Sequence, residues 1–248
     1  MAVTFANRNN AGSVLFQNFT GAGNMKFETR TATVSGQIRV LIAGDTNNAA
    51  ISASLGSRLK TLGYTSSISV QTLGTTYTGA DINTGSYDVV VYYTNSGQTG
   101  ATTLTSNLRS FQNAGGGVVY GTFVWNLKPV GFDYTLTPLQ SLNNQGSSNG
   151  NTTIVNSSPV LNNYTSSFSG GSTILINTFA VGTGSLQPGA TLNSQYSTGS
   201  AYPAVVTTTS GSNSARIVGI NAYLGYVPSY AAINNLLANA VLWSANKI

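Results

Sequence analysis

Nearly continuous apolar runs that end in turn residues constrain the fold of this chain more than any other feature. Three such runs occupy residues 38–43, 87–93 and 118–123. A strand that is covered on both faces has this pattern, whereas a strand with one wet face alternates apolar and polar residues. Residues 51–62 and 101–111 lie between the runs and place apolar side chains at helical spacing. This alternation predicts an α/β fold: a mostly parallel sheet flanked by helices and joined by right-handed crossovers.

Two segments depart from this alternation. Residues 1–36 hold short apolar runs in glycine-rich surroundings, which indicates an N-terminal extended arm. Residues 37–248 form the predicted α/β domain, and about 126–172 within it are rich in Asn, Ser and Gly. A structureless loop of that length is unusual in a compact domain, so we expect a polar β-rich insertion that forms a surface lobe or a contact region.

The C-terminal part returns to regular elements. Strands are expected at residues 173–177, 201–207 and 215–221, because each is rich in apolar and β-branched residues. Apolar side chains at helical spacing then predict a closing helix, on which Trp243 should be a core residue.

The residue types that the chain lacks restrict its chemistry. There is no histidine and no cysteine, and charged residues make up 6% of the 248 residues, against roughly 25% in an ordinary soluble domain. Five residues are acids: Glu28, Asp45, Asp81, Asp88 and Asp133. Since most of the usual general bases and nucleophiles are missing, the composition predicts a protein that is not an enzyme.

Four polar residues are the candidates for a site. Ligands of open α/β sheets bind beyond the carboxyl ends of the strands, and by that rule Asp45, Tyr93, Thr122 and Asn221 could surround one crevice. Thr122 could act as a nucleophile only with Asp45 or a desolvated lysine as its base. The alternative is that Asp45 caps the following helix and that Thr122 is an ordinary turn residue. We therefore assign no catalytic residue, and expect at most a vestigial crevice.

Other chemistries find little support. Asp45 and Asp88 are expected at opposite ends of their strands, so they should not converge as a glycosidase pair. No Asp-x-Asp-x-Asp spacing suggests a metal site. Gly115–Gly117 come after a helix and before a strand, which is typical of a helix stop and not of a phosphate loop, and residues 96–100 lack the lysine of such a loop. We expect no metal and no cofactor.

Partners are indicated only in outline. The ten basic residues form no run, so we expect no direct nucleic-acid contact. No stretch approaches the ~20 apolar residues of a membrane span, and the first residues lack the pattern of a secretory signal. The 13 tyrosines suit protein interfaces or sugar stacking as well as core packing, so a glycan is a possible partner. Glycosylation triplets begin at Asn18, Asn151, Asn156 and Asn163.

The order of elements resembles a known family. Residues 39–45, 87–93, 115–122, 216–221 and 237–243 carry the likeness, which spans about residues 37–248. They resemble the class I glutamine amidotransferase-like superfamily, and especially its trehalose-utilisation-type branch. The resemblance implies a flavodoxin-like fold.

The chain departs from that family at the catalytic positions. In the amidotransferases a cysteine lies on the sharp turn after the strand equivalent to residues 118–121, and a histidine and a glutamate complete the triad. Thr122 stands on that turn here, and the chain has no histidine. The resemblance therefore implies a fold and argues against the family's best-known reaction.

Three functions remain open at this point. The first is a non-enzymatic structural subunit of a large assembly, most plausibly a virion capsid or minor capsid protein, which would be located in the virion and bind copies of itself or other subunits. The second is a carbohydrate-binding or adhesive protein at the cell surface or outside the cell. The third is a residual hydrolase that uses Thr122 and Asp45.

Overall fold

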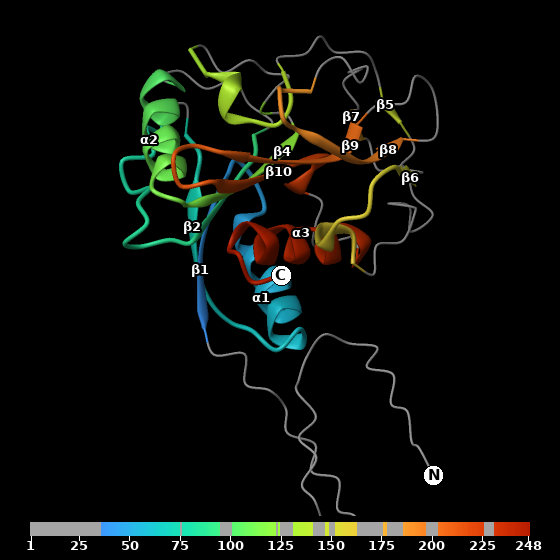
Figure 1. Cartoon of the computed structure of the whole chain (residues 1–248). Coiled ribbons are helices and arrows are strands. Elements are labelled where there is room, and N and C mark those ends of the chain that lie inside the picture. Colours follow the sequence, from blue (N-terminus) through green and yellow to red (C-terminus); the bar gives the residue numbers. More distant parts are fainter. Residues whose placement is uncertain are drawn as a thin grey trace, which may run out of the picture. The chain divides into compact units, whose positions relative to one another are not determined.

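Figure 1 shows the computed structural model of the chain. The structure describes residues 36–74, 76–94, 101–122, 124, 131–140, 147–148, 152–162, 176–177, 186–196, 203–225 and 231–248. The chain divides into two units between Gly36 and Gln37, and every described helix and strand belongs to the second. The arm predicted for residues 1–36 lies outside the described residues, apart from Gly36.

One eight-stranded sheet organises the second unit, in the order β2-β1-β3-β4-β10-β9-β8-β6. The first five strands of this order pair in parallel, and each pairing from β10 to β6 is antiparallel. The parallel strands are β1 (Gln37–Gly44), β2 (Thr65–Thr72), β3 (Val89–Tyr92), β4 (Gly117–Thr122) and β10 (Ala215–Tyr223). The others are β9 (Pro203–Ser210), β8 (Thr191–Tyr196) and β6 (Thr152–Ile154).

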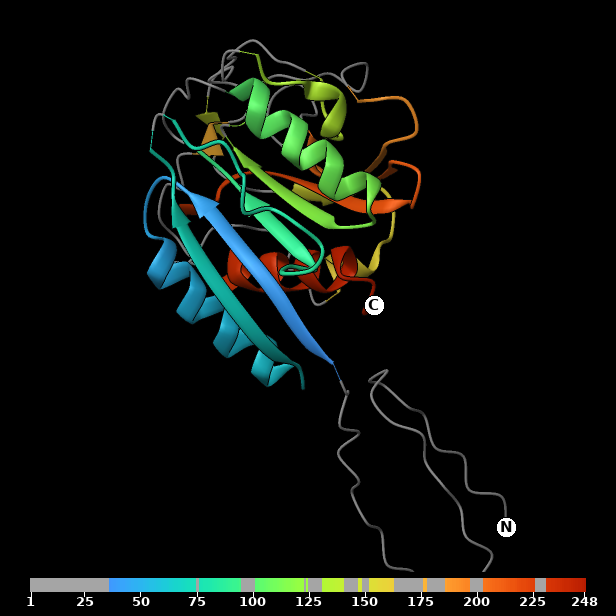
Figure 2. The ribbon, with the colours of Figure 1, turned by 90° about the vertical axis from the view of Figure 1, so that its left-hand side faces the viewer.

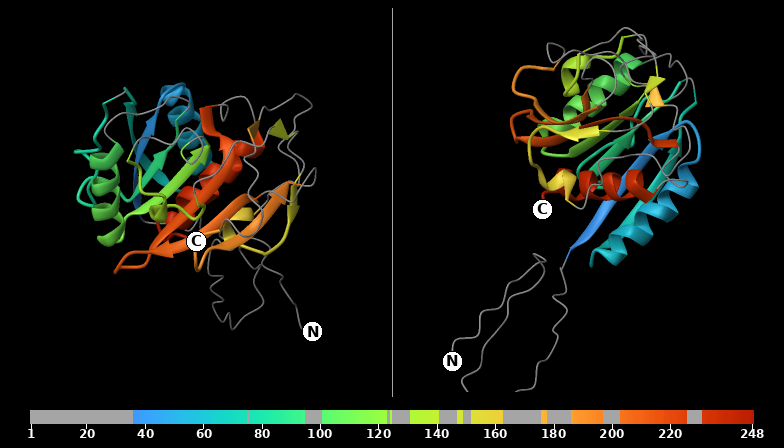
Figure 3. Two further views of the ribbon diagram at one scale, coloured as in Figure 1. Left: turned by 90° about the horizontal axis from the view of Figure 1, so that it is seen from above. Right: turned by 90° about the vertical axis from the view of Figure 1, so that its right-hand side faces the viewer.

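Helices cover both faces of this sheet, as Figure 2 shows. Helix α2 (Ala101–Asn113) lies on one face, while α1 (Asn48–Thr61) and α3 (Ala231–Ser244) lie on the other and contact each other. Seen from above, the antiparallel strands extend the sheet on the side away from β1 and β2 (Figure 3). The predicted α/β fold class, a mostly parallel sheet flanked by helices, is confirmed, and the antiparallel pairings lie at one side of the sheet.

The apolar runs that predicted the sheet form its core. All residues of β3 and β4 are buried, because helices cover both of their faces. On α1, the residues at helical spacing, Ile51, Leu55 and Leu59, are fully buried. The helix ends as predicted before Gly63, whose φ of 87° is a left-handed conformation that glycine adopts easily.

The closing helix corrects one prediction. Leu236 and Ala240 are buried as expected, but Trp243 is only partly buried. The Arg216 guanidinium lies 5.2 Å from the centroid of the Trp243 ring, an arrangement that suits a ring at the rim of a core.

The region predicted as a polar insertion is described only in part. Two short 3₁₀ helices, η1 (Tyr134–Leu136) and η2 (Pro159–Leu161), lie in it, and η2 packs against α3. It also supplies β5 (Ser147–Ser148), which pairs with β7 (Ile176–Asn177) in a separate two-stranded sheet. Strand β6 of the same region joins the main sheet, so this part of the chain completes the α/β domain.

Candidate functional site

The sheet order places a topological switch point at the carboxyl ends of β1 and β3. The chain leaves β1 through α1 and returns on one side as β2, and it later adds β3 on the other side of β1. Adjacent crossovers that run in opposite directions open a crevice beyond the strand ends, which is the usual ligand site of such sheets. All four residues predicted from the sequence lie at or near this edge, which we call the switch-point crevice.

Tyr93 fills the inner part of this crevice. It directly follows β3 and is fully buried. Its hydroxyl lies 2.5 Å from the Thr46 carbonyl oxygen and 2.5 Å from Asn48 Oδ1, and it shares its one hydrogen between these acceptors. The ring lies so close to Gly44 that a Cβ at that position would be 2.1 Å from Tyr93 Cζ. Gly44 at the end of β1 is therefore what lets the ring occupy the crevice.

Tyr223 closes the crevice from the β10 side. Its ring lies edge-on to Tyr93, with 5.9 Å between the centroids. The Tyr223 hydroxyl donates to Asp45 Oδ1 at 3.0 Å and lies 2.7 Å from Thr46 Oγ1. Asp45 is thus fixed by a residue that the sequence analysis counted only as one of the 13 tyrosines. A reach from the end of β10 to the turn after β1 depends on sheet order, which the sequence did not show.

Thr122 and Asn221 form a second buried pair. Both are fully buried, and Thr122 Oγ1 donates to Asn221 Oδ1 at 3.2 Å. Asn221 Nδ2 donates to the Pro203 carbonyl oxygen at 2.8 Å, and the Tyr196 hydroxyl donates to the Asn221 carbonyl oxygen. The register between β10 and β4 shifts between Ile220 and Tyr223, so Asn221 lies in an irregular stretch of the kind that redirects side chains.

Neither Tyr93 nor Thr122 has the surroundings of a base or an activated nucleophile. Burial raises the pKa of Tyr93 far above its ordinary value, so its hydroxyl stays neutral at any physiological pH. The acceptor of the Thr122 hydroxyl is an amide oxygen, which does not take up a proton near neutral pH. The described contacts of the crevice therefore suit holding and positioning groups more than they suit proton transfer.

Two details of the sequence interpretation are wrong. Thr122 is not a surface turn residue, because it is the last residue of β4 and lies in the core. Asp45 does not cap α1, since Asn47 occupies the N-cap position with a φ of 59° and no capping hydrogen bond from its side chain. The buried Asn48 instead donates to the carbonyl oxygens of Gly44 and Gln71, at 2.7 and 3.1 Å.

The open part of the crevice is the turn after β1. Asp45 is half-buried, and Thr46 and Asn47 are exposed. Asn47 Nδ2 donates to the Gly225 carbonyl oxygen at 2.8 Å, which ties the turn to the chain after β10. We call Asp45–Asn47 the crevice mouth. It presents a carboxylate, a hydroxyl and an amide from a turn that is fixed at several points.

Asp88 lies at the other end of the sheet, away from the mouth. It precedes β3 and accepts from the backbone N–H of Arg39 at 2.8 Å and from its guanidinium at 2.6 Å. The expectation that Asp45 and Asp88 do not converge agrees with this placement. Among the residues that the structure describes, no group of three or more acids forms a possible metal site.

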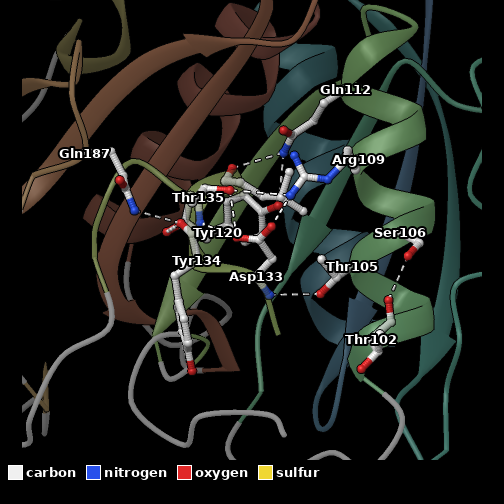
Figure 4. A network of polar contacts seen from close by, with 12 residues as sticks. Thr102, Thr105, Ser106, Arg109, Gln112, Tyr120, Asp133, Tyr134, Thr135 and Gln187 are labelled. Atoms are coloured by element: carbon white, nitrogen blue, oxygen red, sulfur yellow. Dashed lines mark hydrogen bonds and ion pairs between the residues drawn. The ribbon is translucent and has the colours of Figure 1, made fainter. Parts of the chain in front are cut away.

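A further polar network joins α2 to η1 on the face of the sheet that α2 covers (Figure 4). Arg109 forms an ion pair with Asp133, and Gln112 Nε2 donates to the Tyr120 hydroxyl and to the Leu136 carbonyl oxygen, both at 3.1 Å. These bonds attach the 131–140 segment to the helix. We interpret the network as structural.

The structure describes some of the remaining features that the sequence predicted. Gly115 has a φ of 91° after α2, so the glycine triplet is a helix stop as predicted. Asn156, the start of one glycosylation triplet, donates to the Leu192 carbonyl oxygen at 2.8 Å. Asn18, Asn151 and Asn163, which begin the other triplets, and residues 96–100 lie outside the described part of the chain. In that part, no helix is both long and apolar enough to cross a membrane.

Comparisons with known proteins support the fold. Neither known protein families nor curated proteins give a match. Among solved structures, a thua-like protein from Bacteroides uniformis matches with a TM-score of 0.52 and 13% sequence identity, over 84% of this chain and 91% of that one. A thua-like protein from Parabacteroides merdae matches with a TM-score of 0.45 at 13% identity, over 85% and 90% of the two chains. The chain therefore shares the fold of the Bacteroides uniformis thua-like protein.

The match to the Bacteroides uniformis structure corrects the first function that the composition suggested. The structure that shares the fold is a bacterial thua-like protein and not a virion component. The expectation of a structural subunit of a capsid, and of a location in the virion, is therefore wrong. A surface with few charges does not by itself indicate an assembly. The prediction that the chain binds other copies of itself or other subunits stays a prediction.

Proposed function

We propose that the protein is a non-catalytic binding protein with a ThuA-like fold, which holds a hydroxyl-rich small molecule at the crevice mouth. The observation that supports this most is the fixed position of Asp45 at the carboxyl edge of the sheet, where Tyr223 donates to one of its oxygens at 3.0 Å. A carboxylate that is held in place and half-exposed can accept hydrogen bonds from two neighbouring hydroxyls of a ligand without first losing side-chain freedom.

The neighbouring groups favour an uncharged ligand. Thr46 adds a hydroxyl that can accept a hydrogen bond, since its own hydrogen goes to Tyr223, and Asn47 adds an amide that donates and accepts. The described mouth contains no basic side chain that would pair with an anion. A polyol or sugar meets these requirements, because each of its hydroxyls can donate to the carboxylate and accept from an amide. The trehalose-utilisation-type branch that the sequence resembles makes trehalose a sensible first probe.

The absence of catalysis is part of the proposal. The position that corresponds to the amidotransferase cysteine carries Thr122, whose hydroxyl donates to the Asn221 amide. Activation of a threonine needs an adjacent base, and the chain has no histidine to supply one. We expect the purified protein to hydrolyse neither glutamine nor simple esters and glycosides. An activity that disappears in Thr122→Val, while the variant stays folded, would overturn this part.

Calorimetric titration with trehalose and with myo-inositol tests the binding. Asp45→Asn should weaken binding about 10- to 100-fold, because a hydrogen bond to a charged group contributes ~1.5–3 kcal/mol. Asp81→Asn is the matched control, since Asp81 also accepts from a tyrosine, Tyr77, at 2.7 Å but lies elsewhere. The control should bind like the wild type. No binding of either probe, or equal weakening in both variants, would contradict the proposal.

A further inference from the structure

Strand β2 forms one end of the main sheet, and β1 is its one partner among the described strands. Figure 2 shows β2 as the outermost strand beside β1. All eight residues of β2 pair with β1 without a shift in register, so its second edge is equally long and regular. Such an edge presents a row of N–H and C=O groups that can pair with another strand. This edge is separate from the crevice mouth and from the function proposed above.

The even-numbered residues of β2 direct their backbone groups to the free edge. Leu73, which follows the strand, donates from its backbone N–H to the Gly44 carbonyl oxygen at 2.8 Å. In a strand the backbone groups of successive residues point to opposite sides, so the odd-numbered residues of β2 face β1. The outward groups belong to Ser66, Ile68, Val70 and Thr72. The Thr72 carbonyl oxygen accepts from Gln71 Nε2 at 3.0 Å and keeps a second lone pair.

The strand lacks the features that usually protect an exposed edge. Proteins commonly block such edges with lysine, proline or a bulge. The sequence of β2, TSSISVQT, has no charged residue and no proline, and its pairing with β1 shows no bulge. Val70 is also one of the few large apolar side chains of the described residues that are exposed, at 48%. Two copies of this edge can therefore meet without repulsion between like charges.

We propose that two copies of the chain form a two-fold symmetric dimer by antiparallel pairing of their β2 strands. The axis passes at Ser69, so that Ser69 of one copy lies opposite Ser69 of the other. Ile68 then lies opposite Val70, and Ser66 lies opposite Thr72. These even-numbered residues become the hydrogen-bonded pairs of the ladder, which matches the outward direction of their backbone groups. Each copy contributes the same patch, as a closed two-fold interface requires.

The side chains on the α1 face of β2 complement one another in this register. Ile68 lies on that face, since a Cβ added to Gly56 would be 3.5 Å from Ile68 Cδ1. Val70 lies two residues further along the strand and therefore on the same face. Residues opposite each other in antiparallel strands have Cβ atoms about 4.5–5.5 Å apart, so Ile68 of each copy contacts Val70 of the other. The dimer forms this apolar pair twice and covers both exposed valines.

Helix α1 carries small side chains on the side that faces the second copy. Ser54 lines a groove between α1 and α3, and so marks the side of α1 that faces α3. At ~100° per residue, Ser52 and Gly56 lie on roughly the opposite side of the helix, toward the free edge of β2. Ala49 lies one turn before Ser52 on that side. These small residues allow the α1 helices of two copies to lie close together on one face of the joined sheet.

Sedimentation and light scattering of the full chain over a series of concentrations test the dimer. The wild type should change from monomer to dimer as its concentration rises. Val70→Lys should weaken dimerisation roughly tenfold or more, because an edge lysine opposes pairing. Ile154→Lys is the matched control, since Ile154 is equally exposed at 48% but lies on β6 at the other end of the sheet. The control should dimerise like the wild type. A wild type that stays monomeric, or equal weakening by both variants, would overturn the proposal.

Cysteine substitutions test the register of the two strands. The chain has no cysteine, so Ser69→Cys introduces a single thiol. Two such thiols face each other at the axis in a non-hydrogen-bonded pair with Cα atoms about 4.5 Å apart, which a disulfide can bridge. Ser67→Cys is the control on the same exposed face of the strand, and its two thiols lie about 13 Å apart along the strands.

Mild oxidation should therefore link Ser69→Cys into covalent dimers and leave Ser67→Cys as single chains on a denaturing gel. No cross-linking of Ser69→Cys, or equal cross-linking of both variants, would overturn the proposed pairing.

A proline variant separates backbone pairing from side-chain contact, and it keeps the test valid if Val70→Lys fails to fold. Val70→Pro removes an N–H group that points away from β1, and proline is tolerated on an edge strand in that position. The variant should keep the circular dichroism spectrum of the wild type and lose the dimer. Dimerisation of folded Val70→Pro with unchanged affinity would show that the β2 edge does not form the interface.

Discussion

Buried polar atoms are paired in the switch-point crevice, whereas two are unpaired in the α1–α3 groove, the surface between these helices that Arg58 and Asn234 line. In the crevice, Thr122, Asn221 and Tyr93 are fully buried, and each makes hydrogen bonds within the protein. In the groove, Arg58 Nε and Asn234 Oδ1 are buried without a partner. The described buried side chains at the fold's usual ligand position therefore have hydrogen-bond partners within the protein. The two buried atoms of the α1–α3 groove, which the sequence did not indicate, have none.

Paired buried groups stabilise the folded protein, whereas unpaired buried groups destabilise it. A buried hydrogen bond contributes ~1 kcal/mol net, whereas an unsatisfied buried polar atom costs about 1–3 kcal/mol. We expect substitutions in the crevice to be costly and substitutions of the unsatisfied groove atoms to be cheap. Stability measurements can therefore test the contrast without knowledge of any ligand.

Gly44→Ala should have the largest effect, because it forces the crevice open. The new Cβ would lie 2.1 Å from Tyr93 Cζ, and the hydroxyl of that ring is anchored by Thr46 and Asn48. Overpacking of this kind typically lowers the free energy of unfolding by about 1–3 kcal/mol, and we expect the upper end. Urea denaturation measures it. Gly74→Ala, whose Cβ would meet none of the described atoms within 4 Å, should stay within ~0.5 kcal/mol.

Asn221→Ala should follow, at about 2–3 kcal/mol. The change removes the acceptor of Thr122 Oγ1 and the donor to the Pro203 carbonyl oxygen, and both partners stay buried. Asn213→Ala is the control, since Asn213 also donates from Nδ2 to a backbone oxygen, that of Asn113, but is exposed. The control should cost less than ~1 kcal/mol. Equal costs at the two positions would mean that burial does not set the value of these bonds.

The sequence predicted β1, β3 and β4 well, because these strands are buried under helices and alternate with helices along the chain. It did not predict β8, whose segment Thr191–Tyr196 carries the polar residues Asn193 and Ser194 in buried positions. Nor did it predict β6, which is three residues long. A strand with buried polar residues has the hydrophobicity pattern of a loop, so the pattern alone does not predict it.

The sequence predicted which residues lie near the candidate site, but not how their side chains pair. Carboxyl ends of parallel strands meet at one edge, so Asp45, Tyr93, Thr122 and Asn221 could be assigned to one crevice from strand order alone. The side-chain partners depend on geometry that the sequence does not encode locally, such as the reach of Tyr223 to Asp45. The α1–α3 groove depends on the packing of two helices that are distant in the chain, and no motif indicates it.

Tyr93→Phe should have a smaller effect than the two crevice changes above. It keeps the ring but removes the hydroxyl that bonds the Thr46 carbonyl oxygen and Asn48 Oδ1, so we expect a loss of about 1–2 kcal/mol. Tyr77→Phe is the control because Tyr77 bonds the exposed Asp81. Its cost should lie below ~1 kcal/mol in the same denaturation experiment.

Tyr93→Phe should also change how the stability of the protein depends on pH. Burial raises the pKa of Tyr93 in the folded protein, so above about pH 10 the unfolded state loses this proton while the folded state keeps it. The unfolded state then binds fewer protons, and stability falls as the pH rises. Tyr93→Phe lacks this contribution. Its stability should decline less steeply than that of the wild type above pH ~10, and parallel declines would contradict the burial of the hydroxyl.

Asn234→Leu should have the smallest effect and is the sharpest test of the contrast. It removes the unsatisfied Oδ1 and a long bond to the Ser54 carbonyl oxygen, so we expect a change within ~0.5 kcal/mol or a slight stabilisation. Asn239→Leu makes the same change on the same helix, where Nδ2 donates to the Val160 and Asn162 carbonyl oxygens at 3.3 and 2.6 Å. That variant should lose about 2 kcal/mol. If both variants lose equally, Asn234 Oδ1 has a hydrogen-bond partner in solution, and the contrast between the crevice and the groove fails.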